Sequence, residues 1–565
     1  MSLFGSMQMA GNSLRATQIG LQVAGQNIAN ANTPGYIREE VILSPSTTQR
    51  LGGLLLGTGV TVEAVVQKID NFLEGRLRGA TSDRAGGEVQ EEIYKQLEGL
   101  AGDLSDTSIG SSLNDFFSSI NDVLNQPEST SVRNLTVLKG KTLAEDISRL
   151  ATRVGQMRID LNAQVDNAAG DINTLIDQIR SLNVRIASTE GGDISASDAV
   201  GLRDQRKIAL TKLSEIMSIR VEEQKNGGVA IFAGGDYLVY DSQVRHVKTV
   251  SSTDRGLTVS TVQMEDTNSD LEITSGRLKG LTNARDDVLG GYLDKLDTVA
   301  RTLTFEFNKV FASGQGLTGY SSLTSEFAVD DTTVPLDAAG LSYTPVNGSF
   351  QIQVFNRHTG LTQTSTISVD LNGLERDTSL ADLAASIDAI DGVSASISST
   401  RQLTITSDDP DQELAFAQDS SGILAALGLN TFFSGTSARS IGVNRAVLND
   451  ASKFAASRGG IGKDTDTGVD LAVFIDRPLD SMNGETLGGI YDRLTAETTQ
   501  GSTVASAVAE GFRTYEQTLN GQSLATTGVN LDEEAIKMIS FQRVFQASAK
   551  YIATLSELLE VLVNL

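Results

Sequence analysis

Two apolar patterns with heptad spacing, one at each end of the chain, constrain the fold most strongly. The first runs through Leu3, Met7, Ala10, Leu14, Thr17, Leu21, Ala24 and Ile28, and the second runs through Met538, Phe541, Phe545, Ser548, Ile552, Leu555, Leu559 and Leu562. Alternating steps of three and four residues are typical of helices that bury a narrow stripe against another helix. Since neither end contains a compact domain of its own, we expect the terminal helices to pair with each other and then with further copies of the chain.

A longer seam of the same kind lies in the interior. Between Leu143 and Ile186 apolar residues again alternate in fours and threes, with two consecutive fours around Leu161. Such an irregularity is typical of a stutter, which locally unwinds a coiled coil. A helix of this length would extend about 66 Å at 1.5 Å per residue. A third seam, from Leu289 to Val310, is expected to pack along it as the return limb of one bundle.

Two β-rich stretches interrupt the helical pattern. Short alternating runs separated by Asn226-Gly227-Gly228 and Gly234-Gly235-Asp236 predict a small antiparallel unit. Residues 326–440 are rich in Ser, Thr, Asp and Gly, and their periodicities predict a β–β–α–β–β insertion.

The predicted fold class is therefore multidomain α+β, with a long helical coiled-coil or bundle core built from both termini and β-rich domains nested in the middle. We expect four parts: paired terminal helices in 1–36 and 529–565, an elongated helical-bundle domain in 37–215, 276–325 and 441–528, a small antiparallel β unit in 216–275, and an outer β–β–α–β–β domain in 326–440.

Composition disfavours several classes of protein. The 565 residues carry 45 Lys and Arg against 71 Asp and Glu, a net charge of −26, which argues against a nucleic-acid partner because phosphates attract basic surfaces. No window holds the roughly 20 apolar residues of a membrane span, and the N-terminus lacks the pattern of a cleaved secretory signal. The absence of cysteine excludes disulfides and thiol chemistry. With no Trp and 5% aromatic residues, we expect aliphatic cores.

No constellation of catalytic residues can be assembled, so we expect no enzyme, no cofactor and no metal site. His246 and His358 stand alone in polar β regions. The stretch 459–466 resembles a calcium-binding repeat but occurs once, so a solvated loop is the better interpretation. The acidic run 408–411, Asp-Asp-Pro-Asp, is typical of an exposed turn.

Both terminal patterns are embedded in strings that resemble a known family. Residues 21–36, LQVAGQNIANANTPGY, end the first helix in an Asn-Pro-Gly turn and resemble the N-terminal signature of the axial proteins of the bacterial flagellum, which are the rod, hook and hook-associated proteins. Residues 528–549, GVNLDEEAIKMISFQRVFQASA, resemble the C-terminal signature of the same family. Within that family, stretches at 202–214, 276–297 and 424–435 are similar to the subunits of the hook–filament junction.

The resemblance implies a structural protein that leaves the cell through the flagellar type III apparatus without a cleaved signal peptide. It implies a ring or helical assembly of copies of the chain outside the cell, at the distal end of the hook. The implied neighbours are the hook protein and hook-associated protein 3, and a flagellar export chaperone is implied as well. Two alternatives stay open: another axial protein of the hook or rod type, and a secreted adhesin that uses the acidic β insertion.

The predicted assembly interface combines apolar positions of both terminal helices with the turn after the first one. Its residues are Leu3, Met7, Leu14, Leu21, Ile28, Asn30, Asn32, Pro34, Gly35, Tyr36, Met538, Phe541, Phe545, Ile552, Leu555, Leu559 and Leu562. The expected docking face for the export chaperone is the C-terminal subset Phe541, Phe545, Ile552, Leu555 and Leu559.

Overall fold

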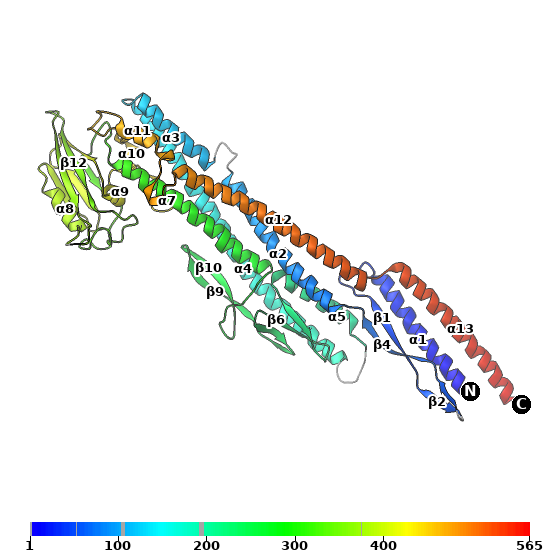
Figure 1. Ribbon diagram of the computed structural model, residues 1–565. Helices are drawn as coiled ribbons and strands as arrows, with labels where there is room; N and C mark the ends of the chain where they lie inside the picture. The colour runs from blue at the N-terminus through cyan, green and yellow to red at the C-terminus, as the bar shows by residue number, and fades with distance from the viewer. Residues whose placement is uncertain (1–2, 52–53, 103–107, 191–196, 375, 565) are drawn as a thin grey trace. The chain divides into compact units, whose positions relative to one another are not determined.

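The computed structural model describes residues 3–51, 54–102, 108–190, 197–374 and 376–564. The chain divides into two compact units (Figure 1). Unit 1 contains Met1–Ile93, Ile159–Arg285 and Thr503–Leu565, and unit 2 contains Tyr94–Arg158 and Asp286–Ser502. The long helices α2 (Asn71–Ala101), α4 (Thr130–Glu190) and α12 (Leu487–Thr527) contribute residues to both units. The helix predicted between Leu143 and Ile186 is confirmed as part of α4, which starts earlier, at Thr130.

The terminal helices of unit 1 are α1 (Leu3–Asn30) and α13 (Leu531–Val563). They run side by side in opposite directions, so the start of α1 and the end of α13 lie at the same end of the unit (Figure 1). The predicted pairing of the two terminal helices is confirmed within the chain. Asn530 caps α13 by accepting hydrogen bonds from the amides of Asp532 and Glu533, and three acidic residues in the first turn favour the positive end of the helix dipole.

A small β layer follows α1. Strands β1 (Glu39–Pro45) and β4 (Val60–Gln67) pair antiparallel with Glu39 opposite Gln67 and a bulge between Ile42 and Leu43. Strands β2 (Thr48–Leu51) and β3 (Leu54–Gly57) form a second antiparallel pair between them. Both α1 and the β1–β4 pair therefore belong to the same end of unit 1, because β1 and β4 also contact α1.

The helix α2 continues through Gly86 and Gly87, where the helical periodicity of the sequence falters. The two glycines serve close packing. A Cβ on Gly86 would lie 3.0 Å from the carbonyl oxygen of Gly276, and one on Gly87 would lie 2.9 Å from the ring of Phe512. Neighbouring backbone and ring atoms thus hold α2 in a helix despite the low helix propensity of glycine.

The rest of unit 1 contains two separate antiparallel strand groups in the region where the sequence predicts a small antiparallel unit. Its helices are α5 (Val200–Ile216) and α6 (Arg277–Asn283). A four-stranded sheet consists of β5 (Arg220–Glu223), β6 (Val229–Ala233), β7 (Asp236–Tyr240) and β8 (Gln243–Val244), and a separate hairpin consists of β9 (Val247–Asp254) and β10 (Leu257–Met264). The turn at Gly234-Gly235 joins β6 to β7 as expected.

Unit 2 has an aromatic core, so the expectation of aliphatic cores is wrong here. Phenylalanine rings from α3 (Ile109–Asn125), α7 (Gly290–Ala312) and later loops contact one another: Phe116, Phe117, Phe307, Phe311, Phe432, Phe433, Phe454 and Phe474. Their ring centroids lie 4.8 to 6.2 Å apart, the spacing of favourable aromatic pairs. A low overall aromatic content conceals this cluster because the residues are far apart in the sequence.

The insertion in unit 2 contains the predicted β–β–α–β–β order, with one further strand on each side of it. Its elements are β11 (Ser322–Thr324), β12 (Gly348–Asn356), β13 (Thr362–Val369), α8 (Leu380–Asp388), β14 (Val393–Ile397), β15 (Leu403–Ser407) and β16 (Gln412–Ala417). Two three-stranded sheets, β13–β12–β16 and β11–β15–β14, share with α8 a buried core that is mainly aliphatic.

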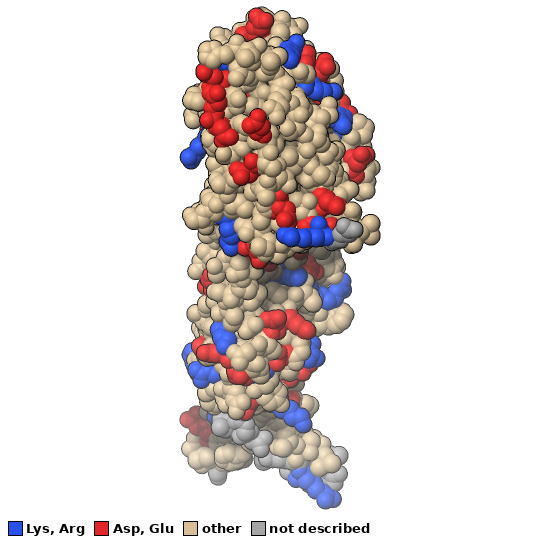
Figure 2. Space-filling view, turned by 90° about the vertical axis from the view of Figure 1, so that its left-hand side faces the viewer, with Lys and Arg blue, Asp and Glu red and all other residues tan. Residues whose placement is uncertain are grey.

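Short elements complete unit 2 after the insertion. They are α9 (Ile423–Leu427), β17 (Phe433–Ser434), β18 (Gly442–Val443), α10 (Arg445–Asn449), α11 (Asp466–Ala472) and three 3-10 turns at Ala451–Lys453, Phe474–Asp476 and Asp480–Met482. On the face drawn in Figure 2, acidic and basic side chains are interspersed over the surface. The α+β architecture predicted for the chain is confirmed.

Candidate assembly interface

Three contacts define how α1 meets α13. The hydroxyl oxygens of Ser13 and Ser548 lie 3.2 Å apart, Gly20 lies against the ring of Phe541, and the side-chain amide of Asn27 donates to Glu534 Oε2 at 3.1 Å. Each contact is one heptad from the next on both helices. The pair is therefore antiparallel and in a single, well-defined register.

Small residues allow the close approach. A Cβ built on Gly20 would lie 2.7 Å from Phe541 Cζ, closer than real Cβ atoms come, so a larger residue would displace the ring. The fully buried positions of α1 are also mostly small: Ser6, Ala10, Ala16, Thr17, Gly20, Val23, Ala24 and Asn27. Backbones that approach closely gain dispersion contacts along the whole pair.

Asn27 is the central polar residue of the site and is completely buried. Its Oδ1 accepts from the amide of Glu39 at 2.9 Å and from the Tyr36 hydroxyl at 2.8 Å. Its Nδ2 donates to the carbonyl of Glu39 at 3.0 Å and to Glu534. The side-chain amide thus pairs with the backbone of β1 as a neighbouring strand would, and it joins α1 to α13 and to the turn after α1.

Arg38 and Glu534 form an ion pair at the same place. Arg38 Nε donates to Glu534 Oε1 at 2.9 Å, and Arg38 Nη2 lies 2.9 Å from Glu533 Oε2. Glu534 is buried, and burial alone would raise its pKa, but hydrogen bonds from Asn27, Lys537 and Arg38 outweigh this and hold the pKa of Glu534 below its ordinary value. The carboxylate therefore stays charged in the folded protein.

The turn after α1 packs on α5. Gly35 has a φ of +81°, and a Cβ there would lie 2.8 Å from Ile208 Cγ1, so both backbone conformation and space favour glycine. Burial, with Glu39 and Asp204 nearby, raises the pKa of Tyr36, so its hydroxyl keeps its proton and donates to Asn27. The predicted turn residues Asn30 and Tyr36 are partly buried, whereas Asn32, Pro34 and Gly35 are exposed.

Asp204 is a second carboxyl group near this turn, and its pKa is raised. Burial raises the pKa of Asp204 to about 6, against hydrogen bonds from the Ile37 amide and from Gln67 and the attraction of Lys207. Gln67 Nε2 lies 2.6 Å from Asp204 Oδ1. Burial is the larger cause of the raised pKa of Glu39, and the nearby charge of Asp204 raises that pKa further.

The predicted apolar interface residues are distributed as follows. Leu555 is buried, Leu562 is exposed, and the others are half-buried: Leu3, Met7, Leu14, Leu21, Ile28, Met538, Phe541, Phe545, Ile552 and Leu559. A second apolar face of α13 is more exposed, and the heptad pattern did not reveal it: Ile536, Ile539, Val544, Tyr551, Leu558 and Val561. Sequence reasoning also missed Gly20, Asn27, Arg38 and Glu534, although their residues stand inside or next to the two family-like strings.

The other sequence candidates occupy ordinary structural positions. His246 Nε2 lies 3.1 Å from Asp177 Oδ2, and His358 Nε2 lies 3.1 Å from Asp411 Oδ2. In the 459–466 loop, Asp464 accepts the amides of Arg458, Gly459 and Asp466. Residues 408–411 form the expected exposed turn. Within the described ranges, no group of three or more His, Asp or Glu side chains could hold a metal ion.

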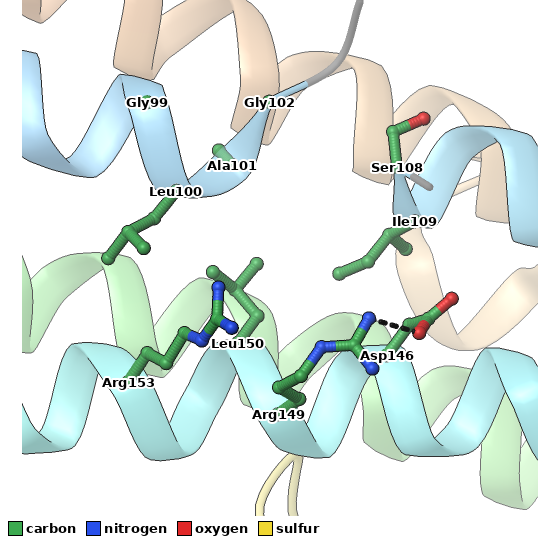
Figure 3. A pocket seen from close by; sticks show the side chains of 10 residues that line it. All are labelled: Gly99, Leu100, Ala101, Gly102, Ser108, Ile109, Asp146, Arg149, Leu150 and Arg153. Atoms are coloured by element: carbon green, nitrogen blue, oxygen red, sulfur yellow. Dashed lines mark hydrogen bonds and ion pairs between the residues drawn. The ribbon is translucent and has the colours of Figure 1, made fainter. Parts of the chain in front are cut away.

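A hollow of about 180 Å³ in unit 2 is lined by the end of α2, the start of α3 and one side of α4 (Figure 3). Arg149 points along α4 to Asp146, with Nη2 and Oδ1 2.5 Å apart. Asp146 also accepts a hydrogen bond from the hydroxyl of Ser112. The hydrogen bond between Ser112 and Asp146 joins α3 to α4, so the hollow is part of helix packing.

Among the described helices, none combines the length and the apolar character needed to cross a membrane.

Family comparisons match both the terminal helices and the interior. A model described as "Flagella basal body rod protein" matches residues 7–36, and one described as "Flagellar basal body rod FlgEFG protein C-terminal" matches residues 520–565. A third, "Flagellar hook-associated protein FlgK helical domain", matches residues 94–325. The helix pair α1–α13 and the turn after α1 thus coincide with the two regions that match flagellar rod models, so the chain is similar to structural proteins of the flagellum at both ends and in its interior.

Individual relatives narrow this class. The chain is 24% identical to flagellar hook-associated protein 1 of Salmonella typhimurium over 98% of each chain, and 24% identical to that of Escherichia coli K12 with the same coverage. It is 29% identical to flagellar hook-associated protein 1 of Bacillus subtilis over 41% of this chain, and that alignment spans 46% of the Bacillus protein. The chain is therefore similar to hook-associated protein 1 along its full length, as the resemblance predicted.

A solved structure shares the fold. The flagellar hook junction protein FlgK from Burkholderia pseudomallei matches with a TM-score of 0.50 and 16% identity, covering 79% of this chain and 99% of that chain. At this level of identity the likeness concerns the fold alone.

Proposed function

We propose that the chain is the structural adaptor subunit that polymerises at the distal end of the hook, forms the hook–filament junction and supports filament assembly. The observation that carries the proposal is the match to hook-associated protein 1 along 98% of the chain, together with terminal helices that match the rod models. The full-length match favours this role over that of another hook or rod protein. The comparisons give no support to the adhesin alternative. Because the proteins that it resembles are structural components of the flagellum, we expect the chain to have no catalytic role.

The proposed assembly joins identical subunits head to tail, since a heterologous interface generates rings or helices. Its interface includes the seventeen-position set predicted from the sequence, of which Asn32, Pro34, Gly35 and Leu562 are the exposed members. The exposed second face of α13 adds apolar area that one chain alone leaves in water. The four predicted parts, from the terminal helices to the 326–440 domain, remain the proposed domain organisation of the subunit.

The proposed partners are further copies of the chain, the hook protein and hook-associated protein 3. Export without a cleaved signal and a location outside the cell follow from the same role. Deletion of the gene should leave hooks without filaments and release flagellin into the medium, and normal filaments in that mutant would contradict the proposal. For the interface, Tyr551→Glu should reduce complementation of the deletion strain, whereas Lys550→Glu, an exposed neighbour on the same turn, should complement fully.

We also propose that an export chaperone binds α13 through Phe541, Phe545, Ile552, Leu555 and Leu559. These side chains are half-buried or buried, and Phe541 lies against Gly20 of α1. Chaperone binding and the α1–α13 pairing therefore exclude each other, and the chaperone should select chains whose terminal helices are apart. A chain truncated before residue 541 that still bound the chaperone would contradict this site.

A further inference from the structure

The apolar stripes of α1 and α13 leave the axial register of the pair weakly specified. In α1 the large residues Met7, Leu14, Leu21 and Ile28 recur every seven positions, so a shift of one heptad replaces like with like. Heptad seams of this kind are commonly assigned a single register by one buried polar residue. Asn27 and Glu534 are the buried polar side chains that meet across this pair.

Both neighbouring registers disrupt the polar contacts. Shifted by one heptad in one direction, Phe541 would meet Asn27 and leave its amide without Glu534. Shifted in the other direction, Glu534 would meet Gly20 and lose both Asn27 and Arg38. Lys537, three residues further along α13, would stay with Glu534, but two of its three hydrogen-bonding side chains would be lost. The desolvation of the buried charge would then be offset much less, which is costly.

Arg38 extends the constraint to two further segments. The amide of Arg38 donates to the carbonyl of Thr527, the last residue of α12, at 2.9 Å. Its carbonyl accepts the amide of Lys68, which follows β4. The guanidinium reaches Glu534 in the first turn of α13. One residue thus links the β1–β4 pair, the end of α12 and the start of α13.

We propose that Asn27, Arg38 and Glu534 act as positioning residues that fix the axial register of α13 against α1. The proposal concerns the single chain and stands apart from the role in the hook–filament junction. In the native register Ser13 meets Ser548, and in the register that brings Glu534 to Gly20, Ser548 instead meets Ser6.

The cysteine-free chain permits a direct test by disulfide trapping. The Ser13→Cys/Ser548→Cys variant reports the native register, because the two hydroxyl oxygens are 3.2 Å apart. The Ser6→Cys/Ser548→Cys variant reports the shifted register. In the otherwise native chain the first pair should oxidise at least tenfold faster than the second.

Glu534→Ala, which places a small residue beside Gly20 in the shifted register, should reduce this rate ratio at least tenfold, and Asn27→Ala should reduce it as well. The matched control is Glu533→Ala, since Glu533 also contacts Arg38 but is exposed. It should leave the ratio within twofold. An unchanged ratio in both Glu534→Ala and Asn27→Ala would overturn the proposal.

If circular dichroism shows that Glu534→Ala has lost helix, neither cysteine pair will oxidise at its expected rate. The milder variant Glu534→Gln is then used. Glu534→Gln keeps the shape and one hydrogen-bond acceptor but removes the charge. It should reduce the ratio by a smaller factor than Glu534→Ala, and an unchanged ratio in this folded variant also contradicts the proposal.

Discussion

The replacement Asn27→Leu tests how much the buried amide contributes to local stability. Leucine has a similar size, so packing changes little, but the four hydrogen bonds of Asn27 are lost. The amide and carbonyl of Glu39 and one oxygen of Glu534 then lose a partner inside the protein. Each unsatisfied buried polar group costs about 1–3 kcal/mol. The half-buried Tyr36 hydroxyl can turn to water and adds little.

These costs give an expected local destabilisation of about 3–6 kcal/mol after partial relaxation. Amides near residue 27, at Val23 and Ala24 of α1 and at Ile536 and Lys537 of α13, should then exchange with solvent at least about a hundredfold faster, because 1.4 kcal/mol corresponds to a factor of ten. Native-state hydrogen exchange followed by mass spectrometry or NMR measures this directly. Exchange in unit 2 should stay unchanged, since unit 2 has its own core.

The matched control is Gln26→Ala, one residue away on the exposed side of α1. It should change the exchange rates by less than about threefold, because surface substitutions usually alter stability by less than 0.5 kcal/mol. Acceleration of less than about fivefold in Asn27→Leu would refute the reasoning. Such a result would mean that water replaces the amide at little cost.

Two further predictions concern a carboxyl and a glycine. Asp204→Asn should stabilise unit 1 at pH 8 by about 1–2 kcal/mol, a value reduced for partial exposure, and should have little effect near pH 4. The sign follows because the folded chain keeps the Asp204 proton up to about pH 6, whereas the unfolded chain releases it near pH 4, so the stability of the native chain falls as pH rises through this window. Urea midpoints of the native and variant chains at pH 4 and pH 8 measure the effect. Equal stabilisation by Asp204→Asn at both pH values would refute the prediction. Gly140→Ala should destabilise unit 2 by about 1–2 kcal/mol despite the better helix propensity of alanine, because the new Cβ would lie 2.5 Å from the Phe432 ring. Gly170→Ala on the same helix has open space around it and should stabilise the protein by about 0.5–1 kcal/mol. Stabilisation by both glycine replacements in urea unfolding would contradict the assigned packing.

The sequence predicted the elements of this fold better than their contacts. Heptad spacing identified α1, α4 and α13, because burial of one stripe imposes a period that a single chain reveals. The same pattern counts only apolar residues, so it overlooked Gly20 and Asn27, whose importance depends on Phe541 and Glu534 about five hundred residues away. Sequence spacing carries no information about such distant pairs.

Two other differences have the same origin in tertiary structure. The helical periodicity falters at Gly86-Gly87, residues of low helix propensity, but contacts with Gly276 and Phe512 keep α2 continuous. The aromatic core of unit 2 is invisible to overall composition, since its residues come from positions between Phe116 and Phe474. Of the candidate site, the terminal helices and the turn could be predicted, whereas the polar contacts that join them required coordinates.

The pairing of the two chain ends has a kinetic consequence. Asn27 and Glu534 are separated by 507 residues, so α1 cannot find its partner until almost all of the chain has been made. At about 5–20 residues per second, this wait lasts roughly 25 to 100 s during synthesis. The fully buried positions of α1 are mainly Ala, Ser, Thr and Gly, so the apolar surface that α1 exposes in that interval comes from its half-buried residues Met7, Leu14, Leu21 and Ile28. Phe541, which lies against Gly20, belongs to the segment that emerges last.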